Sequence, residues 1–100
     1  MKKSKRKKSN PLLYRDLERI VQSAFKITPV ELYTGRSADC NNARKVLWYV
    51  AHNALGVTML KLSDKFGRSV STIHYGIHSA GDKLTKGFIE YVEKELLALR

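Results

Sequence analysis

The sequence predicts an all-α domain of about six helices that contains a helix-turn-helix, on three observations. Apolar residues recur at i, i+3 and i+4 through most of the chain, which is the spacing of one face of a helix. No stretch alternates apolar and polar residues for more than a few positions, as a half-buried strand would. Capping residues precede several of the apolar runs. Because 100 residues can enclose one hydrophobic core but not two, we expect a single helical domain over residues 11–100.

Residues 1–10 form a basic tail ahead of this domain. Six of the 19 Lys and Arg residues lie in the first eight positions, with no apolar residue after Met1. Such a like-charge block is predicted to be disordered. The run breaks at Pro11 before an apolar segment begins, so we expect no secretion signal. Two interpretations stay open: a solubilising leader that need not be native, or an arm that lies along nucleic-acid phosphates.

Two helices are predicted next. The first runs from about residue 11 to 26, with Pro11 at the position where helices favour proline. Its apolar face is formed by Leu12, Leu13, Leu17, Ile20, Val21, Ala24 and Phe25. Thr28-Pro29-Val30-Glu31 has the sequence of a capping box, so a short helix should follow and end near Gly35.

A polar loop and a longer helix are expected in the middle of the chain. Residues 36–42 lack helical periodicity and are predicted to be a loop that contains Cys40. From about residue 42 to 55 a helix presents an apolar stripe, and Gly56 is placed to end it. The stripe comprises Val46, Leu47, Val50, Ala51 and Ala54, with Trp48 and Tyr49 toward its edge.

The segment from about residue 58 to 84 carries most of the functional information. It combines a short amphipathic helix, a tight turn at Gly67, a new cap at Ser69 and a second amphipathic helix. Two short helices joined by a glycine-containing turn of 3–4 residues are typical of a helix-turn-helix. The first helix should bury Met59, Leu60, Leu62 and Phe66, and the second Ile73, Gly76, Ile77, Ala80 and Leu84.

The polar side of the second helix indicates a DNA reader, because small hydroxyls and planar polar rings suit base edges and phosphates. The alternative is an ordinary helical hairpin with a Ser/Thr-rich exposed side. The predicted base-edge contacts are Ser69, Val70, Ser71, Thr72, His74 and Tyr75, with His78 on the same side. The predicted phosphate or minor-groove contacts are Arg36, Arg44, Lys45, Lys61, Lys65 and Arg68.

Charge and composition favour the same partner. A formal net charge of +10 favours a polyanion, with double-stranded DNA ahead of an anionic membrane. No stretch approaches the roughly 18 apolar residues that a membrane span needs. The single cysteine, Cys40, excludes an internal disulfide and fits a reducing cytosol, so we expect a cytoplasmic protein.

A terminal helix is predicted from about residue 86 to 100. Its apolar side comprises Phe88, Ile89, Val92, Leu96 and Leu99. This side either packs on the domain or binds a protein partner or a second copy through Phe88, Val92 and Leu96. We favour packing within the chain, because a domain of this size has little core to spare.

No enzyme, cofactor or metal site is expected from the sequence. Nothing in it assembles a nucleophile, a base and an oxyanion donor, and Cys40 has the setting of an incidental thiol. His74 and His78 are four residues apart and could supply two ligands, but no third zinc ligand can be placed near them from sequence. We therefore assign them to polar contacts with nucleic acid.

The order of these elements resembles the C-terminal DNA-binding domain of the bacterial chromosomal replication initiator DnaA, a Trp-repressor-like helix-turn-helix. Its signature runs Phe-Gly-x-Arg-Asp-His-(Ser/Thr)-Thr-Val-x-His-Ala. The resemblance covers about residues 12–84, including Val21-Gln-Ser-Ala-Phe-Lys-Ile27 and Glu31-Leu32. Arg68 follows Gly67 directly, so the variable position between Gly and Arg is absent here. With that position skipped, Phe66, Gly67, Arg68, Ser71 and Thr72 match the signature, and Ile73 replaces its valine conservatively.

The resemblance implies readout of duplex DNA by the second helix and an arginine from the preceding loop, here Arg36, in the minor groove. Ser69-Val70 stand where the family has Asp-His, and Tyr75 stands where it has its second His. The chain has no Gly-x-x-x-x-Gly-Lys-(Ser/Thr) phosphate loop, so it corresponds to the reader without the ATPase. A generic helix-turn-helix transcriptional regulator stays the alternative, and the process served, whether replication, plasmid or phage maintenance or transcription, stays open.

Overall fold

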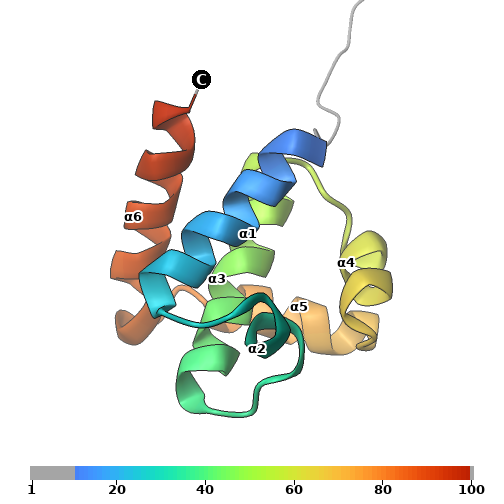
Figure 1. Ribbon diagram of the computed structural model, residues 1–100. Helices are drawn as coiled ribbons and strands as arrows, with labels where there is room; N and C mark the ends of the chain where they lie inside the picture. Colours follow the sequence, from blue (N-terminus) through green and yellow to red (C-terminus); the bar gives the residue numbers. More distant parts are fainter. Residues whose placement is uncertain (1–10, 100) are drawn as a thin grey trace, which may run out of the picture.

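The computed structural model describes residues 11–99, apart from the side chains of Pro11, Leu12, Lys83 and Leu84. The basic tail predicted over residues 1–10 lies outside the described residues, as do the predicted packing positions of Leu12 and Leu84. Residues 11–99 form helices without any strand, which confirms the predicted all-α class (Figure 1). The helices are α1 (Pro11–Phe25), α2 (Pro29–Thr34), α3 (Ala38–Ala54), α4 (Met59–Phe66), α5 (Val70–Ser79) and α6 (Lys83–Ala98). None of the helices in this range has both the length and the apolar character to cross a membrane.

The predicted capping box fixes the start of α2. The Thr28 amide donates to Glu31 Oε1 at 2.8 Å, and the Glu31 amide donates to Thr28 Oγ1 at 3.1 Å. Two amides that have no partner inside the helix are thereby satisfied by side chains. The helix ends at Thr34, and the Gly35 amide still donates to the Glu31 carbonyl at 2.8 Å.

Helix α3 begins earlier than predicted. Ser37 caps it by accepting a hydrogen bond from the Cys40 amide at 3.2 Å, so residues 38–41, predicted as loop, are its first turn. Periodicity missed this turn because most of its side chains are exposed, whereas the cap and the acid Asp39 favour a helix start. Cys40 is buried against Gly35, where an added Cβ would lie 2.3 Å from the Cys40 sulfur.

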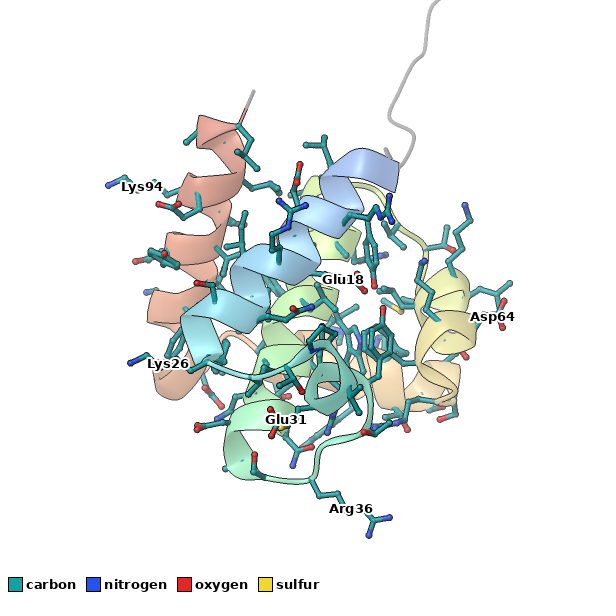
Figure 2. All side chains as sticks on the ribbon, in the orientation of Figure 1. Glu18, Lys26, Glu31, Arg36, Asp64 and Lys94 are labelled. Atoms are coloured by element: carbon teal, nitrogen blue, oxygen red, sulfur yellow. The ribbon has the colours of Figure 1, made fainter. Side chains whose placement is uncertain are left out.

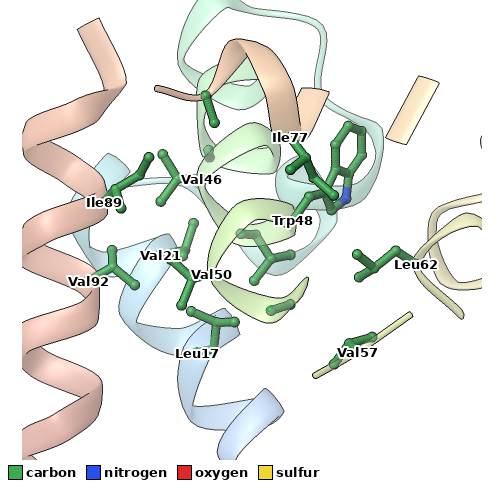
Figure 3. Packing of buried hydrophobic residues seen from close by; sticks show 14 of the residues in the cluster. Leu17, Val21, Val46, Trp48, Val50, Val57, Leu62, Ile77, Ile89 and Val92 are labelled. Atoms are coloured by element: carbon green, nitrogen blue, oxygen red, sulfur yellow. The ribbon is translucent and has the colours of Figure 1, made fainter. Parts of the chain in front are cut away.

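The hydrophobic core surrounds α3. Figure 1 shows α1 crossing in front of α3, with α6 on one side of them and α4 on the other, and α5 packs against both α3 and α4. The core takes its largest members from all of these helices, including Leu17, Val21, Leu47, Val50, Leu62, Ile73 and Val92 (Figure 3). Trp48, predicted to complete the core from the edge of the stripe, is only 3% exposed, as expected. It is buried because α5 covers the side of α3 that the sequence pattern leaves without a partner.

The end of α5 and the start of α6 differ from the prediction. Helix α5 ends at Ser79, and α6 begins at Lys83, three residues before the predicted start. Thr85, in the first turn of α6, is fully buried, and its hydroxyl donates to the Ala80 carbonyl. This side-chain bond satisfies one of the carbonyls that the end of α5 leaves without a helical partner.

The apolar side of α6 packs within the chain. Ile89, Val92 and Leu96 are buried against α1 and α3, which confirms the favoured interpretation of this helix. The alternative prediction was a docking surface made by Phe88, Val92 and Leu96. That surface is not available as predicted, because Val92 and Leu96 already lie in the core. Phe88 is 36% exposed and stacks on Phe25, with ring centroids 4.1 Å apart.

Replacing Phe88 with alanine is expected to lower the free energy of unfolding by about 2 kcal/mol, less than the roughly 3–5 kcal/mol of a fully buried phenylalanine. The stacked contact with Phe25 is lost, but the ring already meets solvent on one side. Chemical denaturation measures this change, with the exposed Leu97→Ala as a control that should have little effect. A shift in sedimentation of Phe88→Ala without loss of stability would instead identify Phe88 as part of an intermolecular contact.

Candidate nucleic-acid interface

Helices α4 and α5 form the predicted helix-turn-helix. Thr58 caps α4, and Ser69 caps α5 by accepting from the Thr72 amide at 3.1 Å. Between them Gly67 adopts the left-handed conformation, with φ 62° and ψ 35°, that favours glycine. The Arg68 amide then donates to the Ser63 carbonyl at 3.2 Å, as in a Schellman-type helix end. The turn and both caps were predicted correctly because each depends on neighbouring residues.

One side of α5 is fixed on α3. Ile73, Gly76 and Ile77 are buried, and Trp48 packs beside Ile77 (Figure 3). A Cβ at Gly76 would lie 2.5 Å from Cε3 of Trp48, so the two helices approach this closely only with glycine at position 76. The close contact gives α5 a rigid base from which its other side faces solvent.

The solvent-facing side of α5 holds the side chains predicted to reach base edges. All six of them are exposed, with Tyr75 at 68% and Val70 at 42%. These are Ser69, Val70, Ser71, Thr72, His74 and Tyr75, and His78 is exposed beside them. Ser69 and Thr72 are also joined by a hydroxyl–hydroxyl contact of 2.9 Å, because Ser69 is the cap of the helix.

The first helix of the motif departs from the prediction at one position. Leu62 and Phe66 are buried and Met59 is half-buried, but Leu60 is 64% exposed. Leu60 precedes Lys61 and points away from the core, which leaves an isolated apolar side chain on the outer face of α4. A single exposed leucine is common on protein surfaces and needs no functional explanation.

The prediction that Arg44 contacts DNA is wrong. It was expected to contact phosphate, but it is only 3% exposed and its guanidinium is occupied within the chain. It donates to the carbonyls of Leu32 at 3.0 Å and Gly35 at 2.7 Å, and to Asn41 Oδ1 at 2.5 Å. Burial, with a smaller effect of the nearby Arg68 charge, lowers the pKa of Arg44. Arg44 therefore holds the α2–α3 loop in place and is not a surface contact.

Arg68 also makes a structural contact within the chain. It is half-buried, and Nη2 donates to the Tyr33 carbonyl on α2 at 3.5 Å. The turn of the helix-turn-helix is thereby tied to α2, 35 residues earlier in the chain. Sequence reasoning missed both arginine contacts, since a backbone carbonyl acceptor leaves no signature in the choice of side chain.

Aromatic rings connect the same helices. Tyr33 of α2 stacks on Phe66 of α4 with centroids 4.4 Å apart, and Trp48 meets Phe66 edge-on at 5.5 Å. The Tyr33 hydroxyl donates to Glu18 of α1. Desolvation, together with this hydrogen bond, raises the pKa of Tyr33 to about 12, so the phenol stays neutral at physiological pH. The cluster anchors α4 to the body of the domain.

The other predicted basic contacts lie at the surface. Lys61 and Lys65 are exposed on α4, and Lys65 Nζ lies 4.6 Å from the ring centroid of Tyr14. Lys45 is half-buried, and its Cγ lies 3.8 Å from the Cβ position at Gly76, which places its stem beside α5. Arg36 projects from the α2–α3 loop away from the body of the domain (Figure 2). Lys45 thus lies beside α5, whereas Arg36 lies in the α2–α3 loop and points away from the domain.

His74 and His78 lie against each other on α5. Their Nε2 atoms are 3.0 Å apart, and their ring centroids are 4.2 Å apart with a tilt of 51° between the ring planes. Among the described residues no group of three or more His, Cys, Asp or Glu side chains is placed to hold a metal ion. The pair therefore brings two ring nitrogen atoms close together, and no third protein ligand is placed with them among the described residues.

No protein-family model, curated protein or solved structure matches this chain. Its function has to be argued from the geometry of the helix-turn-helix and the surrounding charges.

Proposed function

We propose that the protein binds duplex DNA by placing α5 in the major groove. The observation that carries this proposal is the division of α5 into two sides. One side is packed on Trp48 of α3, and the opposite side exposes hydroxyl, imidazole and phenol groups along the helix. The major groove admits an α-helix and presents the hydrogen-bonding groups that such side chains recognise.

Each exposed group has a defined role in this proposal. Ser71, Thr72, His74 and Tyr75 hydrogen-bond to base edges, and Val70 contacts a thymine methyl group. Lys45, Lys61 and Lys65 bind phosphates on either side of the groove, and Arg36 reaches the backbone or the minor groove. Arg44 and Arg68 support these contacts by holding the α2–α3 loop and the turn.

The process that we propose is that of an initiator-type DNA reader, which acts in the cytoplasm without catalysis. The support is the match at Phe66, Gly67 and Arg68, with Gly67 in the left-handed turn that the motif needs. A generic helix-turn-helix regulator has the same local requirements and is the alternative. A protein-interaction module has less support, because Val92 and Leu96 are buried in the chain's own core. Electrostatic adhesion to RNA or anionic lipid, without sequence readout, is supported by net charge alone.

Selection of bound sequences from a random duplex library tests the proposal. We expect one enriched motif for the wild type, and loss of enrichment at one or two positions for Tyr75→Ala. The matched control is Leu97→Ala on α6, which also removes an exposed side chain and should leave the motif unchanged. Flat enrichment for the wild type would favour adhesion without readout.

Removal of residues 1–9 is expected to weaken binding to every duplex and leave the preferred sequence unchanged. The deletion removes six positive charges, and each lost phosphate contact lowers the slope of log K against log salt by about 0.9. Fluorescence anisotropy at several salt concentrations measures this slope on specific and random duplexes. Complete loss of sequence preference would show that the tail reads a groove.

A further inference from the structure

The imidazoles of His74 and His78 lie against each other on one face of α5. Both residues lie in α5, one turn apart, and positions i and i+4 share one face of a helix. Their Nε2 atoms, the ring nitrogens farthest from the backbone, are 3.0 Å apart. Both side chains are exposed, so the point between the two nitrogens is accessible from solvent.

The 3.0 Å separation discriminates between coordination geometries. With metal–nitrogen bonds of about 2.0–2.1 Å, two ligands at 90° lie about 2.8–3.0 Å apart, whereas two ligands at a tetrahedral angle lie about 3.3–3.4 Å apart. The observed distance matches the 90° angle. That angle is typical of neighbouring ligands in tetragonal Cu²⁺ and Ni²⁺ sites with nitrogen and oxygen donors.

We propose that His74 and His78 form a bidentate site for a divalent transition-metal ion, with Cu²⁺ preferred over Ni²⁺ and Zn²⁺. The two Nε2 lone pairs bind the ion, and water fills the remaining positions because the described structure places no third protein ligand there. The order of preference follows the Irving–Williams series, in which Cu²⁺ binds nitrogen donors most strongly.

The neutral pair of imidazoles can bind the metal ion without losing a proton. The 3.0 Å contact between the two Nε2 atoms requires one ring to donate its Nε2–H and the other to accept. When the ion binds, the donor ring moves its proton to Nδ1, and both rings then present Nε2 as ligands. The site does not depend on the proposed DNA function, and each can fail without the other.

Titration of the full chain with Cu²⁺, followed by calorimetry and electron paramagnetic resonance, tests the proposal. We expect one equivalent to bind with a spectrum of two nitrogen ligands from imidazole. His74→Gln and His78→Gln should each weaken binding on the order of 100-fold, because a single imidazole lacks the intramolecular second contact. Glutamine suits a helix, and both positions are exposed, so circular dichroism should show that these variants fold.

The matched control is His52→Gln, which removes the third histidine of the chain. His52 lies on α3, where Nδ1 is 2.9 Å from the Val57 carbonyl, and it takes no part in the pair. This variant should bind Cu²⁺ like the wild type. Unchanged affinity in either pair variant, or an equal loss in His52→Gln, would show that the ion binds elsewhere and overturn the proposal.

Discussion

Replacing Arg44 with alanine is expected to lower the free energy of unfolding by about 3 kcal/mol. The salt dependence of DNA binding by the folded protein should stay unchanged. Hydrogen bonds from a charged donor contribute about 1.5–3 kcal/mol each, and Arg44 donates to two carbonyls and to Asn41. Loss of the guanidinium also leaves the Leu32 carbonyl without this donor in a buried position. In a domain of this size the melting temperature should fall by more than about 10 °C.

The neighbouring Lys45→Ala is the matched control with the opposite outcome. Its stem lies beside α5 and its side chain is half-buried at the surface. Stability should change by no more than about 0.5 kcal/mol, whereas the salt slope of duplex binding should fall by about 0.9. Thermal unfolding and anisotropy titrations below the melting temperature separate the two effects. A lower salt slope of duplex binding for folded Arg44→Ala would show that Arg44 does contact phosphate.

The double substitution Ser69→Asp with Val70→His is expected to create preference for the nine-base-pair box of the replication initiator. The wild type should bind that box little better than a random duplex, because it lacks the carboxylate and imidazole that the initiator family has at these positions. Each new hydrogen bond to a base edge is worth about 1–3 kcal/mol of discrimination. Two such hydrogen bonds therefore amount to at least about a 30-fold change in the ratio of affinities for box and random duplex.

The structure makes this substitution feasible. Ser69 is the cap of α5, and aspartate is an equally good capping residue, so the start of the helix should be kept. Val70 is exposed, and histidine there displaces no core contact. Val70→His alone is the control, and it should give only part of the preference. Anisotropy titrations on both duplexes measure the result, and tight selective binding of the wild type to the box would contradict our interpretation of positions 69 and 70.

The sequence by itself determined the elements whose physics is local. The capping box at Thr28, the caps Thr58 and Ser69, and the left-handed turn at Gly67 each involve residues within about five positions of one another. Helical periodicity assigned most of the buried sides of α1, α5 and α6, but it missed the buried Tyr14 of α1 and wrongly included Leu99, which is 55% exposed. The start of α3 was misplaced, since an exposed first turn carries no apolar period.

Only the tertiary structure decided the roles that depend on distant partners. Arg44 and Lys45 are adjacent and both basic, yet burial beside the Leu32 and Gly35 carbonyls makes one structural and leaves the other at the surface. Spacing placed His74 and His78 on one face of a helix, but their 3.0 Å contact depends on side-chain rotamers. A sequence specifies local backbone preferences directly. Which side chain finds a partner far along the chain depends on how the helices pack together.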